Sequence, residues 1–394
     1  MIDTGTPANV ADGGDADKSG APTTAERRTA AIVVLGVMGG LGLYVLLQTH
    51  FGLAQALPVA AGTAILAWLL VGFLYWWVLA KVPYFAPIGR TVRWLALMWG
   101  ALVAVLLASA LENQLPALTV TSTATTQAMA VAVIAGLVEE GVKALGILVL
   151  FLFVQRPRTL VEGLVIGGTV GLGFEVSEDF AYSLADAWTA GSDGPAGIVL
   201  TMVSRAATSV VSHWAFSLIA GVGVAYVFCA RWARPGRRAA VLVGCIALAM
   251  VLHMAWDAPG LGTSIKVQGA TEAIKDGVVI IAIVVAVLLV MRWARNREGE
   301  FYVTYLVRNG DHNLTDTHLH ALPHGKTRRE ARKAAGKVAE TRAERRKIHA
   351  EVRAVHRAAA HLAVSIAQGD ANSVAAKRDA LQSSLARVSA PGSV

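Results

Sequence analysis

Charge and cysteine are both scarce in this sequence. Of its 394 residues, 16% are charged and 55% are hydrophobic, whereas about 25% charged residues is usual for a soluble domain. The two cysteines, Cys229 and Cys245, stand singly in apolar runs, which excludes a disulfide framework and a cysteine-rich metal site. The run His-Glu-x-x-His is absent, so the common helical zinc signature is missing. This composition excludes an ordinary soluble globular protein.

The sequence has long apolar runs instead. Most of them approach or exceed the roughly 20 residues that cross a bilayer as a helix. We therefore predict an all-α, polytopic membrane helix bundle with about eight transmembrane helices and a cytosolic α-helical C-terminal tail. The predicted spans are residues 30–47, 58–80, 94–111, 128–154, 160–184, 207–230, 239–257 and 273–293.

The connections between these spans alternate in charge. The second, fourth and sixth loops carry Lys and Arg, the first and third carry none, and the seventh carries only Lys266. The positive-inside rule then predicts a multi-pass plasma-membrane protein with cytoplasmic N- and C-termini. The predicted domains are a disordered N-terminal tail (1–29), a transmembrane domain (30–293) and a basic cytosolic tail (294–394).

The tail holds the excess of positive charge. Residues 295–394 contain 18 Lys and Arg against 10 Asp and Glu, whereas residues 1–294 are balanced at 17 and 17. No nucleic-acid-binding motif accompanies this charge, so no nucleic-acid partner is expected. Apolar residues at helical spacing predict a hairpin of two helices around the turn 369–373: Ile348, Val352, Val355, Ala359, Leu362 and Ile366 on the first, Val374, Leu381, Leu385 and Val388 on the second.

Three ionisable residues lie in the middle of the fourth span: Glu139, Glu140 and Lys143. A charge at the bilayer centre costs about 2.5–3.5 kcal/mol, so such groups normally face the interior of the bundle and have partners. Helical spacing lets Lys143 pair with one glutamate and leave the other free for chemistry. A buried ion pair that only fixes helix packing is the alternative.

The fifth span contributes Glu178, which shares one helix face with Phe174 and Tyr182. Tyr182 is predicted to hydrogen-bond this carboxylate or a substrate backbone. Asp179 and Asp186 are expected to be solvated charges. Earlier in the same run, small residues at every fourth position would let another helix approach closely: Gly163, Gly167 and Gly171.

Histidines follow in the next two spans. His213 lies between Ser209 and Ser217 on one face, and His253 precedes Asp257 by four residues. Asp257 is therefore predicted to orient the imidazole of His253. Because successive spans cross in opposite directions, Glu139, Glu140, Glu178, His213 and His253 are all expected between the midplane and the outer surface.

Four short motifs in this order resemble the PrsW family of intramembrane proteases, which is related to the CAAX-processing and bacteriocin-processing membrane proteases. They read EEGVK, FEVSEDFAY, SHWAFS and HMAWD, and they fall within residues 135–257. Two features depart from the family pattern. Asp179 stands where many relatives have Asn, and Glu175 is an acid with no counterpart in the motif.

The resemblance implies peptide-bond hydrolysis in or beside the membrane, with membrane-protein substrates such as anti-sigma-factor-like regulators. Glu140 is the predicted base, with Glu139 positioning it or sharing its role, and the histidines stabilise the oxyanion or protonate the leaving nitrogen. The implied catalytic residues are Glu139, Glu140, Glu178, His213 and His253, supported by Lys143, Phe174, Tyr182 and Asp257.

The cofactor and the function class have alternatives at this point. Metal-free glutamate catalysis is favoured, whereas a zinc enzyme would use Glu178, His213 and His253 as ligands and Glu140 as base. A proton- or ion-coupled transporter also keeps acids and histidines at mid-depth, although it predicts matching sites in both halves of the chain. A non-catalytic membrane scaffold is the third alternative. The substrate and the oligomeric state are not predicted.

Overall fold

The computed structural model describes residues 24–81, 88–114, 124–157, 159–189, 191, 198–199, 212–230, 233–259, 265–309, 313–323, 325–368 and 371–389. Every regular element in these ranges is a helix, which confirms the all-α prediction. The predicted N-terminal tail lies outside them, except that residues 24–29 already belong to the first helix.

The first part of the chain, up to Asn309, forms nine α-helices within the described residues. Two of them continue into π-helical turns, labelled η1 and η2. The elements are α1 (Thr24–Ala56), α2 (Pro58–Lys81), α3 (Arg90–Met98), η1 (Trp99–Ala104), α4 (Val105–Glu112), α6 (Ala124–Val149), η2 (Leu150–Val154), α7 (Leu160–Thr189), α9 (His213–Cys229), α10 (Pro235–Asp257) and α11 (Ile265–Asn309).

Six stretches in the described part of the chain are long and apolar enough to cross a membrane. They are Ala25–Ala56, Pro58–Trp77, Arg90–Glu112, Leu160–Thr189, Pro235–Asp257 and Ala273–Val307. The charged α6 and the shorter apolar α9 pack among them. The chain is thus a multi-pass membrane protein. Each of the eight predicted spans overlaps described helix, although residues 207–211 of the sixth lie outside the described residues, and a count of eight transmembrane helices is not confirmed.

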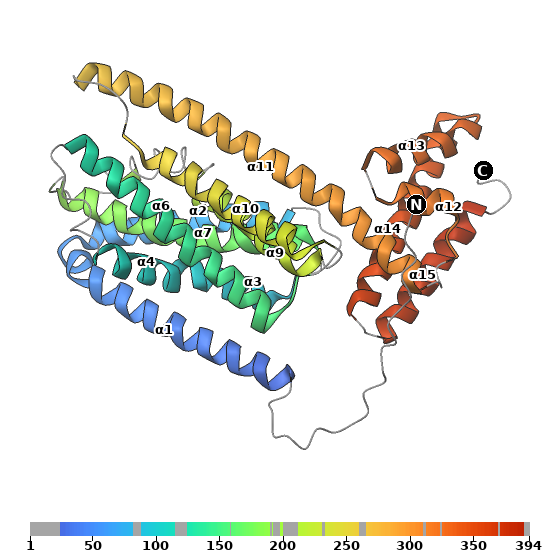
Figure 1. The fold of residues 1–394 in the computed structure, drawn as a ribbon, viewed down its shortest axis with the longest axis horizontal. Coiled ribbons are helices and arrows are strands. Elements are labelled where there is room, and N and C mark those ends of the chain that lie inside the picture. The colour runs from blue at the N-terminus through green and yellow to red at the C-terminus, as the bar shows by residue number, and fades with distance from the viewer. Residues whose placement is uncertain are drawn as a thin grey trace.

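α7 lies at the centre of the bundle (Figure 1) and is buried without interruption from Leu160 to Glu175. Its glycine stripe faces α9: a Cβ on Gly167 would collide with the carbonyl oxygen of Ser217, and one on Gly171 with that of His213. The two helices therefore touch through their backbones, as the small-residue spacing predicts. This contact places the start of α9 beside the middle of α7.

A second close approach joins α6 to α10. A Cβ on Gly136 would lie 2.6 Å from Cγ of Met254 and 3.1 Å from the carbonyl oxygen of Met250. Only a residue without a side chain allows this approach. It brings His253 of α10 to the turn of α6 that carries Glu139 and Glu140.

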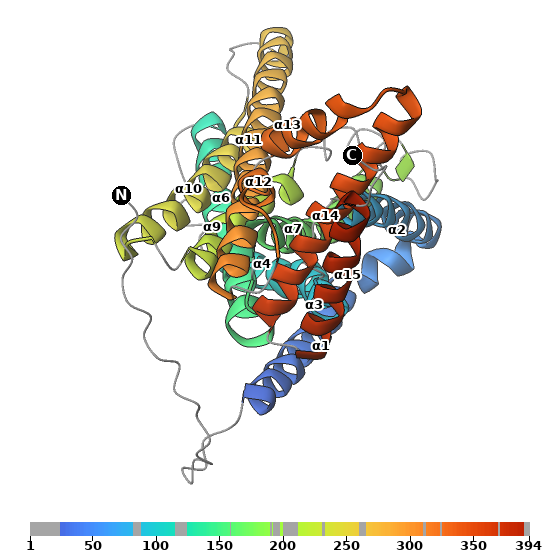
Figure 2. The ribbon, with the colours of Figure 1, turned by 90° about the vertical axis from the view of Figure 1, so that its right-hand side faces the viewer.

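The C-terminal helices lie beyond one end of the bundle (Figures 1 and 2). α11 continues as one helix through residue 293, the predicted end of the transmembrane domain, to Asn309. Apolar residues near the end of α11, among them Tyr302 and Leu306, form a core with Val355 and Leu362. The elements are α12 (Asp316–Ala321), α13 (Gly325–Ala335), η3 (Gly336–Val338), α14 (Arg342–Gln368) and α15 (Ala371–Ser389), the last two where the hairpin is predicted.

Candidate active site

The ammonium group of Lys143 is the centre of a buried ionic cluster. Its Nζ lies 3.0 Å from Oε2 of Glu139 and 2.8 Å from Oε1 of Glu140. The same atom lies 2.8 Å from Nδ1 of His213 and 3.7 Å above the ring of Phe174. The side chain of Lys143 is fully buried, so these contacts replace its hydration.

The prediction that Lys143 pairs with only one of the two glutamates is therefore wrong. The lysine contacts both carboxylates instead of leaving one free, because its long side chain extends between them. The same geometry gives Phe174 a role that helical spacing alone did not reveal. Its ring covers the ammonium and also contacts His213, with ring centroids 5.0 Å apart.

Two carboxylates flank the ring of His213. Its Nε2 lies 2.5 Å from Oε2 of Glu178, and its Nδ1 lies 3.6 Å from Oε2 of Glu139. Because Lys143 donates to Nδ1, the Nε2 atom carries the ring proton and donates to Glu178. Ser209, predicted on the same face, lies outside the described residues.

His253 is held in a similar way from α10. Its Nδ1 lies 3.1 Å from Oε1 of Glu140, and its Nε2 lies 3.1 Å from Oδ2 of Asp257 and 3.9 Å from Oε2 of Glu139. The ring of Phe216 stacks on it at 5.1 Å between centroids. The predicted pairing of His253 with Asp257 is present, and Glu140 fixes the opposite edge of the ring.

A cavity of about 1350 Å³ borders this cluster. It lies between α1, η1, α4, α6 and α7, and it reaches Glu139, Glu178 and Asp257. Tyr182, which is 47% exposed, also lines it. Glu140 is fully buried and does not border the cavity. Of the two adjacent glutamates, Glu139 is thus the one that borders the cavity.

Glu175, which fits no motif, stabilises the start of α9. Its Oε2 accepts hydrogen bonds from the hydroxyl of Ser212 and from the backbone N–H of His213, the latter at 3.1 Å. The first N–H groups of a helix lack intrahelical partners, and here a carboxylate from the neighbouring α7 supplies one. Glu175 therefore fixes the backbone from which the imidazole of His213 extends.

The positions of two further acids, Asp179 and Glu112, were not predicted correctly from the sequence. Asp179, predicted to be solvated, is fully buried, whereas Asp186 is exposed as predicted. Glu112 at the end of α4 was not singled out, yet it lines the cavity. No motif surrounds it, and only the packing of α4 against α6 and α7 places it near the cluster.

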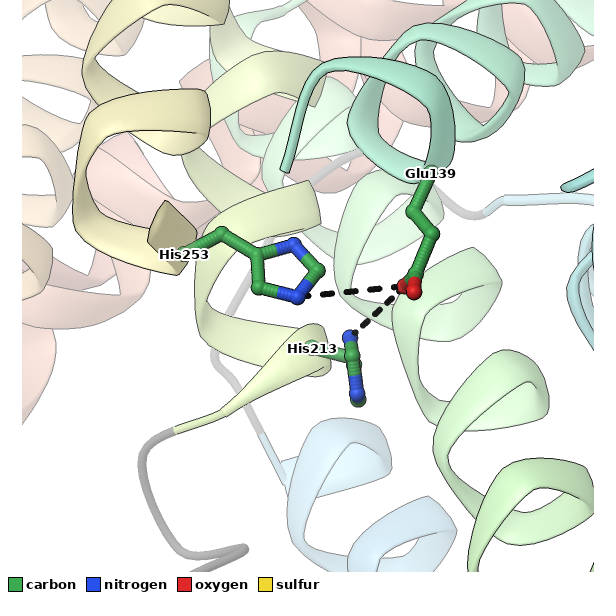
Figure 3. Close-up of side chains that lie close together, drawn as sticks. All are labelled: Glu139, His213 and His253. Carbon is green, nitrogen blue, oxygen red and sulfur yellow. Dashed lines mark ion pairs between the residues drawn. The ribbon is translucent and has the colours of Figure 1, made fainter. Parts of the chain in front are cut away.

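Glu139, His213 and His253 together form a candidate metal site (Figure 3). Each offers one ligand atom, and these atoms all lie within 4.8 Å of one another. Ligands at 2.0–2.1 Å from a tetrahedral zinc ion are roughly 3.3 Å apart. The distances of 3.6 and 3.9 Å from Glu139 to the two imidazoles are close to this value.

The surroundings of the two histidines fit the same interpretation. Metal-binding histidines usually bind a carboxylate or carbonyl through the other ring nitrogen, and here Glu178 contacts His213 and Glu140 contacts His253. Glu178 thus contacts Nε2 of His213, the ring nitrogen on the far side from Glu139. It is therefore not one of the three grouped donors, although it was predicted as a zinc ligand. Lys143 contacts two of the three donor atoms, so a divalent ion would displace its ammonium from them.

Comparison with known families agrees with this geometry. The model described as "PrsW family intramembrane metalloprotease" matches residues 89–291 of the 394. The chain belongs to the PrsW family. The match begins just before α3 and ends within α11, so α1 and α2 precede it. Comparison with curated proteins and with solved structures finds no match.

Membership of the PrsW family confirms the predicted resemblance and the predicted enzyme class. The chain is an intramembrane peptidase, so the transporter and scaffold alternatives are set aside. The family is described as a metalloprotease, and the structure holds a Glu/His/His group of suitable type. From the sequence, metal-free glutamate catalysis was favoured over a zinc enzyme, whereas these two findings favour a metal-dependent enzyme.

Proposed function

We propose that this PrsW-family protein cleaves membrane-protein substrates in the cavity beside Glu139, on the side of the membrane opposite its C-terminal helices. The main supporting observation is that Glu139, Glu178, His213 and His253 come together from four helices, and that Glu139 and Glu178 of this cluster border one cavity. The Lys- and Arg-rich loops support a plasma-membrane orientation with both termini cytoplasmic. Single-span regulators such as anti-sigma-factor-like proteins are the proposed substrates.

Glu139, His213 and His253 would hold a divalent metal ion, zinc by the type of donor. The ion would supply Lewis-acid activation of water and of the scissile carbonyl. Glu178 borders the cavity and is the proposed proton carrier. It takes a proton from the attacking water and returns it to the leaving nitrogen, so that the C–O bond forms as the C–N bond breaks. The products are a carboxylate and an amine.

The remaining polar residues position this group. Glu140 holds His253 through Nδ1, and Asp257 contacts its Nε2. Lys143 balances the charge of Glu140, and also that of Glu139 while no ion is bound. Tyr182 is placed to donate a hydrogen bond to the substrate backbone from the cavity wall.

The test compares membrane proteomes of cells that express wild type, Glu139→Gln, His253→Ala or the exposed control Asp186→Asn. We expect truncated single-span proteins with wild type and the control, and their full-length forms with the two site variants. Identical fragments in all four strains would overturn the proposal.

A parallel measurement addresses the metal. Purified wild type should contain about one zinc ion per chain, and His213→Ala and His253→Ala should each lose it. A metal-free wild type that retains chelator-resistant cleavage would refute the metal assignment and favour metal-free glutamate catalysis.

A further inference from the structure

The cavity beside the site is lined by acidic side chains and by no basic Lys or Arg among the described residues. The four carboxylates that line it are those of Glu112, Glu139, Glu178 and Asp257. Three of the four are already in ionic contacts, with Lys143, His213 and His253 respectively. The fourth, Glu112, has no ion pair among the residues that the structure describes.

Glu112 is the last residue of α4. Its Oε1 atom is buried and has no hydrogen-bond partner among the residues that the structure describes. Glu139 and Glu178 repel the carboxylate of the partly buried Glu112, and Lys143 and His253 oppose this repulsion with smaller effects. A cation beside Glu112 would pair with its Oε1 atom and reduce the remaining repulsion.

Another part of the cavity wall is formed by α1. Apolar residues line one part of it, including Val45, Leu46 and Leu53, and the polar residues Thr49 and His50 lie between them. α1 lies outside residues 89–291, which the family model matches. This wall is therefore a feature of the present chain beyond the matched family core. An apolar wall with a few polar groups suits a peptide segment that leaves the bilayer.

We infer that the cavity selects substrate segments that carry a Lys or Arg side chain close to the scissile bond, and that Glu112 binds this side chain. The inference rests on the proposed function. Segments on the outer side of a membrane are poor in Lys and Arg, so a single basic residue there distinguishes a substrate from most other membrane proteins. Glu112 is thus a specificity-determining residue.

The experiment uses the full-length protein in liposomes with a set of single-span reporters. The reporters are identical except for one position, scanned across the residues on both sides of the cleaved bond, which is Arg, Gln or Glu. The measured quantity is the ratio of kcat/KM between Arg and Gln reporters. We expect a ratio of about tenfold for wild type at one or two positions, the size of one partly buried charge pair.

Two variants and a control identify the responsible residue. Glu112→Gln should bring the ratio close to one, and Glu112→Lys should reverse it in favour of the Glu reporter. The exposed Asp186→Asn should keep the wild-type ratio. Because each ratio compares two reporters on the same protein preparation, partial misfolding of a variant does not change it.

The outcomes separate this inference from the proposed function. Cleavage by wild type without preference at any position overturns the inference and leaves the proposed function intact. An Arg preference that persists unchanged in Glu112→Gln also overturns it. If wild type cuts no reporter and no cellular protein, the proposed function and this inference fail together.

Discussion

Replacement of Lys143 by Met should destabilise the protein strongly. The ammonium is fully buried and lies within 3.0 Å of three partners, from Glu139, Glu140 and His213. Met fills much of the same volume but leaves two carboxylates without their cation. Removing one partner of a buried ion pair costs about 3–5 kcal/mol, because the other charge remains buried and uncompensated. We expect a loss of that size in the free energy of unfolding.

A second variant tests whether the charge, and not the shape, causes this loss. The double variant Lys143→Met/Glu140→Gln removes the fully buried carboxylate, while Glu139 still borders the cavity. It should be more stable than Lys143→Met by about 1–3 kcal/mol, the usual coupling energy of residues in one ionic network. Lys326→Met, at an ammonium that is 87% exposed, should change stability by less than about 0.5 kcal/mol.

Denaturant titration of the purified protein in detergent, followed by tryptophan fluorescence, measures all four proteins. The reasoning would be refuted if Lys143→Met unfolded within about 1 kcal/mol of wild type, since a buried cation between two carboxylates costs more than that to remove. It would also be refuted if the double variant were less stable than the single one.

Three further outcomes are expected. Gly167→Val should destabilise by about 1–3 kcal/mol or more in the same titration, because its side chain meets the carbonyl oxygen of Ser217, whereas Gly62→Ala faces open space and should be neutral or stabilising. Glu175→Gln should lower kcat about tenfold with little change in KM, since it weakens the hydrogen bonds that fix the start of α9; an unchanged kcat would argue against this positioning. In the C-terminal helices, burial and the nearby His318, Arg328 and Arg332 lower the pKa of His356 to about 4. This region should therefore be fully stable above the unfolded pKa of 6.5 and lose stability as the pH falls from there towards 4. Amide protection factors in α14, corrected for the intrinsic exchange rate at each pH, should fall between pH 7.5 and pH 5 in wild type but much less in His356→Leu.

Most of the helix positions could be predicted from the length of the apolar runs and from helical spacing. Each predicted span overlaps a helix within the described residues, and the glycine spacing of α7 correctly indicates a close helix contact. Spacing along one helix also predicts the contact between His253 and Asp257. These features are local, since each depends on residues within a few turns of one another.

Other features depend on distant packing and were missed for that reason. Glu112 has no local signal, because α4 reaches the cavity only through its contacts with α6 and α7. Asp179 looks like a solvated acid at the end of an apolar run, yet it is fully buried. Glu175 belongs to α7 but acts on the first residues of α9, which are 37 and 38 positions away in sequence. Single-helix periodicity gives no access to such contacts.

The two adjacent glutamates show the same limit most clearly. Neighbouring helical residues project about 100° apart, so the two carboxylates need not border the same surface. Which one faces the cavity depends on the rotation of α6, and that rotation is fixed by the approach of Met250 and Met254 to Gly136. The result directs Glu139 to the cavity and Glu140 to the interior, where it holds Lys143 and His253. Loss of Glu139 should therefore abolish cleavage and metal binding while the fold persists. Loss of Glu140 should first appear as a disturbed His253 and a less stable protein.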